Sequence, residues 1–197
     1  MPEGFISQET EGISSLTVNI SRSAPRGVPN GGGSVTSEIT LRKPLADDGP
    51  RVNALIAACP PLDTNSAYCN LLQCSHFADT CIVAEVDGDV LGWISGYRLP
   101  QDPSRFFVWQ VAVSDAARGQ GLAGRMLDGL MNRPEADGVT HVITTVTRDN
   151  GSSWAMFRRW AERHSAPLAE SEHFERDRHF GGKHASEWLV EIGPLPR

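Results

Sequence analysis

The sequence predicts an α/β fold in which a mixed β-sheet is flanked by helices. Strand-like and helix-like patterns follow one another along most of the chain, and a glycine turn at Arg118–Ala123 joins a strand pattern to a helix pattern. At 197 residues and 40% hydrophobic content, the chain suits one domain with one buried core. We therefore expect a single domain over residues 38–192, followed by a C-terminal tail over residues 193–197.

The N-terminal part differs in composition from the rest. Ser, Gly, Pro and Asn dominate it, as in SRSAPRGVPNGGGS at Ser21–Ser34, and no apolar period is sustained. Such a segment buries too little apolar surface to offset the entropy of ordering. We interpret residues 1–37 as a disordered extension and expect the fold to begin at Glu38–Arg42, a strand with Ile39 and Leu41 on one face.

Two helices are predicted next. The apolar residues of Val52–Cys59 recur at i, i+3, i+4 and i+7, and the Pro60–Pro61 pair must end that helix. In the segment after the prolines, Tyr68 and Leu71 lie at helical spacing. This predicts a second, short helix with Thr64 or Asn65 as its N-cap.

Three consecutive strands follow these helices. Cys81–Val86 and Val90–Tyr97 are joined by Asp87–Asp89, whose residues tolerate positive φ, so the pattern indicates a hairpin. Phe106–Val113 is the third strand and leads to the glycine turn.

The second half of the domain combines two helices with further strands. His141–Val146 has a strand pattern, and Glu187–Ile192 alternates as a terminal strand or part of a hairpin. Apolar stripes mark a helix after the glycine turn and a helix after the His141 strand. The first stripe is Leu122, Met126, Leu127, Leu130 and Met131, and the second is Trp154, Phe157, Trp160 and Ala161.

Charge and composition exclude several classes of protein. The net charge is −6, with 24 acidic and 18 scattered basic residues, which argues against nucleic-acid binding. No apolar run approaches the ~20 residues that span a bilayer, and the N-terminus lacks the order of a signal peptide. The four cysteines and six histidines fit no common metal-site spacing. We expect a cytoplasmic protein that binds no metal, membrane or nucleic acid.

The glycine turn RGQGLA suits an anion. Gly119 and Gly121 permit close approach of the backbone, and the first N–H groups of the following helix point at the ligand. It lacks the Gly-Lys-Ser/Thr and GxGxxG patterns of other phosphate loops. An ordinary loop before a surface helix is the alternative. The turn resembles the acetyl-CoA signature of the GNAT acetyltransferases, (Gln/Arg)-x-x-Gly-x-(Gly/Ala), at Arg118, Gly121 and Ala123.

Five further blocks carry a closer resemblance, which covers residues 38–192. The blocks are CPPLDTNSAYCNLLQCSHFADT (Cys59–Thr80), FVWQVAV (Phe107–Val113), ARGQGLAGRML (Ala117–Leu127), TTVTRDNGSSWAMFR (Thr144–Arg158) and HFGGKH (His179–His184). They resemble the L-2,4-diaminobutyrate acetyltransferases of ectoine biosynthesis, a family of small homodimers. The resemblance implies a GNAT fold, with splayed central strands that hold acetyl-CoA, and acetyl transfer to the 4-amino group of diaminobutyrate.

The resemblance implies a set of cofactor contacts. Main-chain groups from Val111 to Val113 pair with the pantetheine arm, and an N–H near Val111 stabilises the oxyanion. Asn150 contacts the cofactor or caps a helix, and these two interpretations are compatible. The full predicted set is Val111, Ala112, Val113, Arg118, Gly119, Gln120, Gly121, Leu122, Ala123, Gly124, Arg125 and Asn150.

Diaminobutyrate has two ammonium groups and one carboxylate, so its site needs acidic side chains and a donor. The resemblance assigns Asp63, Tyr68, Trp109, His184 and Glu187 to the acceptor. The alternative for Trp109 is a core aromatic, and the alternative for Tyr68 is a residue that only packs its helix. Asp63 alternatively caps a helix, and His184 is a solvated loop residue.

The amine must lose a proton before it attacks. Glu187, directly or through water, and His184 are the candidate bases. Many GNAT enzymes place a Tyr seven residues after the Asn, where this chain has Phe157, so Tyr68 is a candidate acid. Three rival functions remain: acetylation of another small diamine or diamino acid, acetyl-CoA sensing without catalysis, and protein acetylation.

Overall fold

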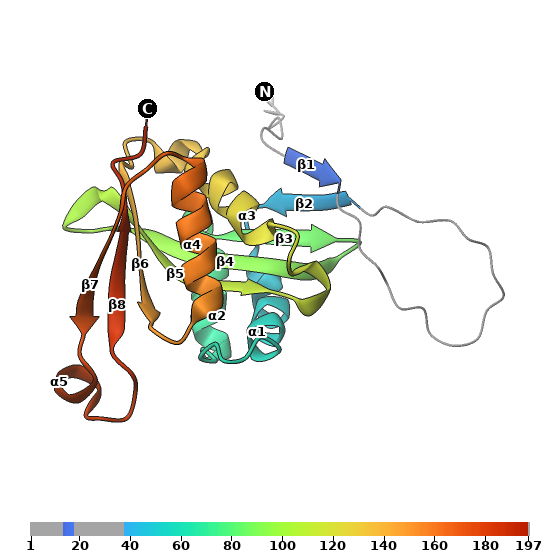
Figure 1. Ribbon diagram of the computed structural model, residues 1–197. Coiled ribbons are helices and arrows are strands. Elements are labelled where there is room, and N and C mark those ends of the chain that lie inside the picture. Colours follow the sequence, from blue (N-terminus) through green and yellow to red (C-terminus); the bar gives the residue numbers. More distant parts are fainter. Residues whose placement is uncertain (1–13, 18–37, 197) are drawn as a thin grey trace, which may run out of the picture.

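The computed structural model describes residues 14–17 and 38–196. In this part of the chain, eight strands form one mixed sheet in the order β1-β2-β3-β4-β5-β6-β8-β7 (Figure 1). Neighbouring strands are antiparallel except for β5 and β6, which are parallel. The strands are β1 (Ser14–Thr17), β2 (Glu38–Arg42), β3 (Ile82–Val86), β4 (Asp89–Leu99), β5 (Asp102–Val113), β6 (His141–Thr147), β7 (Leu168–Phe174) and β8 (Glu187–Ile192).

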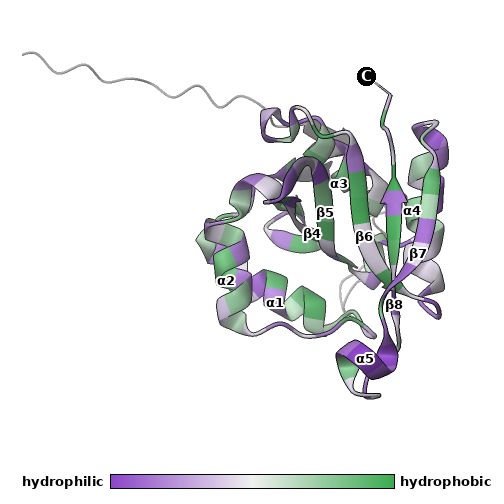
Figure 2. Cartoon of the chain, turned by 90° about the vertical axis from the view of Figure 1, so that its left-hand side faces the viewer, coloured by the Kyte–Doolittle hydropathy of each residue, from purple (hydrophilic) through white to green (hydrophobic). Residues whose placement is uncertain are grey.

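Helices lie on both faces of the sheet, which confirms the predicted class of fold (Figures 1 and 2). On one face are α1 (Gly49–Ala57) and α2 (Ala67–Ser75), and on the other are α3 (Leu122–Met131) and α4 (Gly151–Arg163). A short helix, α5 (Arg176–Phe180), joins β7 to β8 and is largely hydrophilic in Figure 2.

Strand alternation divides the buried residues into two cores. Successive side chains of a strand point to opposite faces of the sheet. Accordingly Ile82 and Ala84 pack with α3 and α4, whereas Val83 and Trp93 pack with α1 and α2. All four aromatic and apolar residues of the predicted α4 stripe are buried, as are Leu122, Met126, Leu127 and Leu130 of α3.

The predicted hairpins are confirmed. Asp87 and Gly88 have φ values of 49° and 87° in the turn between β3 and β4. The C-terminal strand is half of a hairpin, because β7 pairs antiparallel with β8.

The structure differs from the sequence analysis at the N-terminus. The predicted disordered extension falls largely outside the described residues, but Ser14–Thr17 within it form β1. This strand pairs with β2 from Ser14 opposite Leu41 to Thr17 opposite Glu38. Four residues are too few to show an alternating pattern, so backbone pairing with β2 defines the strand.

The second helix also differs from its prediction. Its N-cap is Ser66, whose Oγ accepts a 3.1 Å hydrogen bond from the Cys69 N–H, and neither Thr64 nor Asn65 has that role. The buried face carries Asn70, Gln73 and Cys74, while Tyr68 is 69% exposed. Polar residues can form this face because the Asn70 amide donates a hydrogen bond to the Gln73 amide oxygen. A search for apolar positions at helical spacing does not detect such a face.

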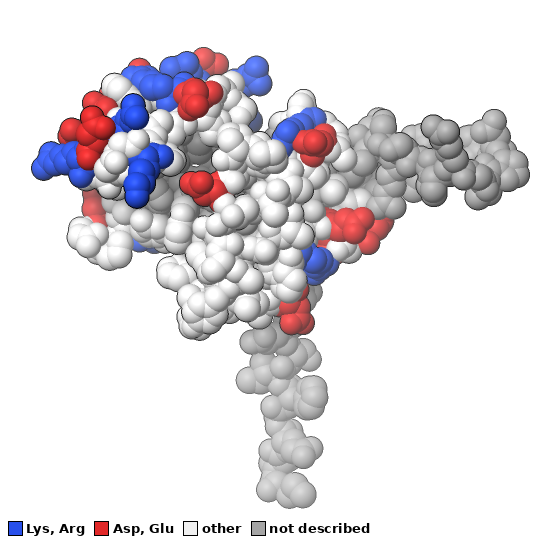
Figure 3. Space-filling model, turned by 90° about the horizontal axis from the view of Figure 1, so that it is seen from below, with Lys and Arg blue, Asp and Glu red and all other residues white. Residues whose placement is uncertain are grey.

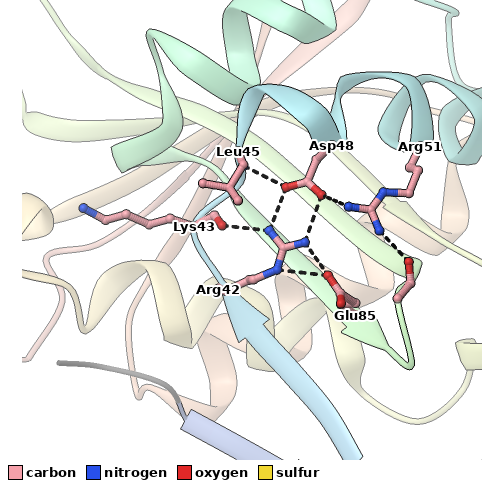
Figure 4. A network of polar contacts seen from close by, with 7 residues as sticks. Arg42, Lys43, Leu45, Asp48, Arg51 and Glu85 are labelled. Atoms are coloured by element: carbon pink, nitrogen blue, oxygen red, sulfur yellow. Dashed lines mark hydrogen bonds and ion pairs between the residues drawn. The ribbon is translucent and has the colours of Figure 1, made fainter. Parts of the chain in front are cut away.

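A partly buried ion network around the buried Asp48 joins the start of α1 to the sheet (Figure 4). Both carboxylate oxygens of Asp48 accept hydrogen bonds from Arg42, at 2.6 and 2.9 Å, and Arg42 also bonds Glu85 on β3. The Leu45 N–H donates to Asp48 at 2.7 Å, and Arg51 forms a further ion pair with it. This network stabilises the connection between β2 and α1.

The two parallel strands separate at the centre of the sheet. β5 and β6 pair only from Arg105 opposite His141 to Phe107 opposite Ile143. On the other side of β5, Val108 and Gln110 face successive residues of β4, so Trp109 forms a β-bulge. Beyond Phe107 the β5 backbone is no longer paired with β6, as the splayed arrangement requires.

Candidate active site

One cavity lies where β5 and β6 separate, a second lies between the end of β5, the glycine turn and α4, and Val111 and Ser153 line both. The first, of about 480 Å³, is the acceptor cavity, and the second, of about 410 Å³, is the cofactor cavity. The shared residues place a ligand in one cavity next to a ligand in the other.

The glycine turn and α4 form the walls of the cofactor cavity. Gly119 and Gly121 have φ values of 74° and 71°, and a Cβ at either position has no atom within 4 Å. The backbone is therefore open to a ligand, and Gly121 is the N-cap of α3. The free N–H groups of the first turn, together with Arg118, make this a site for an anion.

Most of the predicted cofactor residues line this cavity, but four do not. Ala112 is 1% exposed and belongs to the core on the α1 side, and Arg125 is absent from the lining. The Gln120 amide bonds the Ala116 carbonyl at 3.1 Å and does not line the cavity. Asn150 lines the acceptor cavity instead. The residues in place are Val111, Val113, Arg118, Gly119, Gly121, Leu122, Ala123 and Gly124.

Asn150 caps α4. Its Oδ1 accepts hydrogen bonds from the Ser153 N–H at 3.1 Å and from the Ser152 hydroxyl at 3.0 Å. The capping interpretation is therefore correct, and the cap also brings Asn150 to the cavity wall.

Residues of α4 were missed by the sequence analysis. Met156, Arg159 and Arg163 line the cofactor cavity. They lie on one side of α4, at i, i+3 and i+7. This spacing is the only feature of the sequence that could have indicated them.

Four of the five predicted acceptor residues meet in the acceptor cavity. Asp63 follows α1, Trp109 is in β5, His184 follows α5 and Glu187 begins β8. Tyr68 lies on the exposed side of α2 and is not part of the lining. A single chain therefore does not bring Tyr68 to the cavity.

Trp109 is not a core residue. Its side chain is 50% exposed and lies edge-on to Tyr97, with ring centroids 6.4 Å apart. Trp109 lies at the bulge, is half exposed and lines the acceptor cavity, so the alternative of a buried aromatic is wrong.

The acceptor cavity is acidic. Among its lining residues there is no Lys or Arg, whereas Asp63, Asp149 and Glu187 all contribute carboxylates. Asp149 was missed, since its only signal was its position beside Asn150. Such a cavity favours a cation.

The environment shifts the pKa values of two of these carboxylates in opposite directions. Burial raises the pKa of Glu187, opposed by the nearby His184 and by a hydrogen bond with Thr145. A hydrogen bond with Thr147 lowers the pKa of Asp149. Glu187 therefore accepts a proton more readily than Asp149, and Asp149 stays charged to lower pH than Glu187 does.

The neutral form of His184 has one defined tautomer. Its Nδ1 lies 2.7 Å from the Ala185 carbonyl oxygen, which only accepts, so Nδ1 carries the proton and Nε2 is the unprotonated nitrogen of that form. The Phe180 ring stacks on the imidazole, with centroids 4.7 Å apart. Nε2 is therefore available as a base.

Phe157 occupies the position of the usual GNAT tyrosine. It is 2% exposed and lines the acceptor cavity, so no hydroxyl is available there. Within the described residues no group of three or more His, Cys, Asp and Glu is placed to hold a metal ion. No helix in the described ranges is long and apolar enough to cross a membrane.

The fold and the two joined cavities define an acyl-CoA-dependent acyltransferase of the GNAT class. The acetyltransferase (GNAT) family model matches residues 51–161. Ard1 of Thermoplasma volcanium, 16% identical with a TM-score of 0.63, shares the fold over 80% of this chain and 99% of its own.

Two other relatives are more similar. The L-2,4-diaminobutyric acid acetyltransferase of Methylotuvimicrobium alcaliphilum is 47% identical over 157 residues, which are 80% of this chain and 91% of the relative. The diaminobutyrate acetyltransferase of Paenibacillus lautus, solved with L-2,4-diaminobutyric acid and coenzyme A, is 41% identical with a TM-score of 0.78 and covers 82% of this chain and 98% of its own. The chain belongs to the L-2,4-diaminobutyrate acetyltransferase family.

Proposed function

We propose that this chain transfers the acetyl group of acetyl-CoA to the 4-amino group of L-2,4-diaminobutyrate, for ectoine biosynthesis. The observation that carries this proposal is the acidic acceptor cavity joined to the glycine-turn cavity at Val111 and Ser153. Three carboxylates without a Lys or Arg among the lining residues suit an acceptor with two ammonium groups.

The cavity also offers a donor for the acceptor carboxylate. Trp109, whose indole carries an N–H group, belongs to its lining. The lining residues thus include both carboxylates for the amines and an N–H donor for the carboxylate of diaminobutyrate.

Acetyl-CoA, the co-substrate, fits the second cavity. The pyrophosphate takes the N–H groups that follow Gly121, near Arg118, and the pantetheine arm enters between β5 and β6. The thioester then lies beside Val111, whose N–H is the proposed oxyanion donor, a contribution of ~3 kcal/mol.

Deprotonation of the acceptor is the step that needs a side chain. An alkylammonium has a pKa of about 10.4, so loss of its proton at pH 7 costs up to ~4.6 kcal/mol. Glu187, whose pKa burial raises, and His184, with its free Nε2, are the proposed bases. Attack of the neutral amine on the thioester carbonyl forms the C–N bond and breaks the C–S bond, which gives the amide, the CoA thiolate and one proton that the thiolate or solvent takes up. A thiol has a pKa near ~8.5, so the thiolate leaves with little help.

The test is acetyl transfer by the purified full chain. L-2,4-diaminobutyrate, ornithine, lysine and spermidine are supplied separately with acetyl-CoA, thiol release is followed, and the product is assigned by NMR. Strong preference for diaminobutyrate with acetylation at N4 is expected. Preference for another amine would assign a different diamine as substrate, and acetyl-CoA binding without turnover would indicate a sensor.

The chain is further proposed to work as a homodimer in the cytoplasm. Exposed apolar side chains, including Tyr68, Leu71 and Phe77, support a partner surface, and Figure 3 shows a broad area without charged side chains. The free cysteines suit a reducing compartment. Light scattering at several protein concentrations measures the oligomeric state, and a monomer would refute the dimer.

A further inference from the structure

The segment Leu62–Ser66, here called the acceptor segment, connects α1 to α2 and carries Asp63 and Asn65 into the acceptor cavity. It has no regular secondary structure after the Leu62 turn, and Asp63, Thr64 and Ser66 are exposed. A segment of this kind has few buried contacts to fix its position. Its place over the cavity therefore depends on its hydrogen bonds.

One side chain of the sheet bonds the segment at two points. The Gln110 Nε2 donates to the Asp63 carbonyl oxygen at 2.9 Å, and the Asn65 Nδ2 donates to the Gln110 Oε1 at 2.9 Å. Both the donor and the acceptor of the Gln110 amide are therefore used. Of the residues that bond the segment, Gln110 is the one that lies in the sheet.

The other side of the segment is bonded to the helices. The Asn53 Nδ2 donates to the Asn65 carbonyl oxygen at 3.1 Å and to the Asn70 Oδ1 at 2.8 Å. The Asn70 Nδ2 in turn donates to the Gln73 Oε1 at 3.0 Å. These amides attach the segment to α1 and α2 but not to β5.

Gln110 follows the bulge at Trp109 directly. Val108 and Gln110 face successive residues of β4, so Trp109 is inserted between them, and all three line the acceptor cavity. The distortion that inserts Trp109 into the strand thus also places the Gln110 amide beside the segment.

We propose that Gln110 is a positioning residue for the acceptor: it holds the acceptor segment against β5 and so keeps the Asp63 carboxylate at the cavity wall. This inference rests on the proposed function for its choice of substrate. Gln110 contacts the segment through the Asp63 backbone and the Asn65 side chain, so it acts on the diaminobutyrate side of the active site and not on the acetyl-CoA side. Loss of the Gln110 amide is therefore expected to change the KM for diaminobutyrate and not the KM for acetyl-CoA.

Gln110→Met tests the proposal, since methionine keeps the length of the side chain and removes both hydrogen bonds. Gln101→Met is the matched control, because Gln101 is exposed in the β4–β5 turn and outside both cavities. Loss of two hydrogen bonds of ordinary strength is expected to raise the KM for diaminobutyrate by about tenfold. The KM for acetyl-CoA and the thermal midpoint of unfolding are expected to stay close to those of the wild type.

A second measurement does not depend on the substrate. Hydrogen exchange of the Cys69 and Asn70 amides, which donate to the Ser66 Oγ and to the Ser66 carbonyl oxygen, is measured on the protein without ligand. It is expected to become faster in Gln110→Met and to remain unchanged in Gln101→Met. Faster exchange together with a selective rise in the diaminobutyrate KM supports the proposal. Unchanged exchange, or an equal rise in both KM values, would overturn it.

The two measurements also separate this proposal from the proposed function. If the wild type does not acetylate diaminobutyrate, the proposed function fails, and the exchange experiment still decides whether Gln110 fixes the segment. If the wild type is active and exchange in Gln110→Met is unchanged, the proposed function stands and the role of Gln110 is refuted.

Discussion

Asp128 on α3 accepts a 2.8 Å hydrogen bond from the indole nitrogen of Trp160 on α4. The same carboxylate bonds Arg163 at 2.6 Å and lies 2.9 Å from the His164 Nε2. Trp160 is 1% exposed, and Arg163 lines the cofactor cavity. One carboxylate thus connects the packing of two helices to the wall of a ligand site.

Replacing Asp128 by alanine is expected to destabilise the protein by about 1–3 kcal/mol, because the buried indole N–H loses its acceptor. Chemical denaturation measures this change. The exposed Asp137→Ala is the control and is expected to stay within ~0.5 kcal/mol of the wild type. Equal stability of the two variants would show that the hydrogen bond from Trp160 to Asp128 makes no net contribution to the free energy of unfolding.

Gly121→Ala is expected to weaken acetyl-CoA binding more than it affects the diaminobutyrate KM. The substitution places a Cβ at φ 71°, where strain costs about 1–2 kcal/mol, in the turn that lines the cofactor cavity. Gly88→Ala is the matched control, since Gly88 also has a positive φ, of 87°, and open space at its Cβ, but lies in the β3–β4 turn. Isothermal titration calorimetry with CoA compares them. If Gly121→Ala and Gly88→Ala lose a similar amount of CoA affinity, the loss comes from backbone strain in general and not from the cofactor turn.

Glu187→Gln is expected to lower kcat/KM by about 10²–10⁴-fold if Glu187 is the base. Its pKa is raised by burial, so the folded state binds more protons than the unfolded state above the usual carboxyl range. Stability therefore falls as the pH rises through that window, and at neutral pH the glutamine variant is expected to be at least as stable as the wild type. Rates and thermal midpoints from pH 4 to 8 test both statements, with the exposed Glu172→Gln as control. A variant that loses stability and activity together would indicate a structural role instead.

Asp48→Ala is expected to cost about 3 kcal/mol, because Arg42 then lacks its bidentate partner in a partly buried site. Burial opposes the charge of Asp48, but the hydrogen bonds from Arg42 and the Leu45 N–H outweigh it and lower the pKa of that carboxyl. A lowered pKa gives stability that is present above the usual carboxyl value and is lost as the pH falls through the folded-state value. Urea denaturation at pH 7 and below pH 4 measures this. The difference between wild type and variant is expected to shrink in acid, and the exposed neighbour Asp47→Ala is expected to change little at either pH.

The sequence by itself determined the order of strands and helices from β2 to α4 and the glycine turn. Hydrophobic period distinguishes helices from strands, as in the stripe at Trp154, Phe157 and Trp160, all three of which are buried in α4. Chain-local chemistry also predicted that the backbone at Gly119 and Gly121 is open to a ligand, and the structure has open space at both glycines. The resemblance added Asp63, Trp109, His184 and Glu187, which the fold brings into one cavity.

Only the tertiary structure decided which side chains reach that cavity. Trp109 is presented by a bulge whose register depends on β4, and Tyr68 faces away because the amides of Asn70 and Gln73 form the buried side of α2. Gln110 and Asp149 show no pattern in the chain, since their roles come from distant residues. Gln110 bonds Asp63, 47 positions away, and Asp149 interacts with Glu187, 38 positions away. Period and composition report on neighbours along the chain, whereas cavities and hydrogen-bond networks join distant segments, so their members are defined only when the sheet has formed.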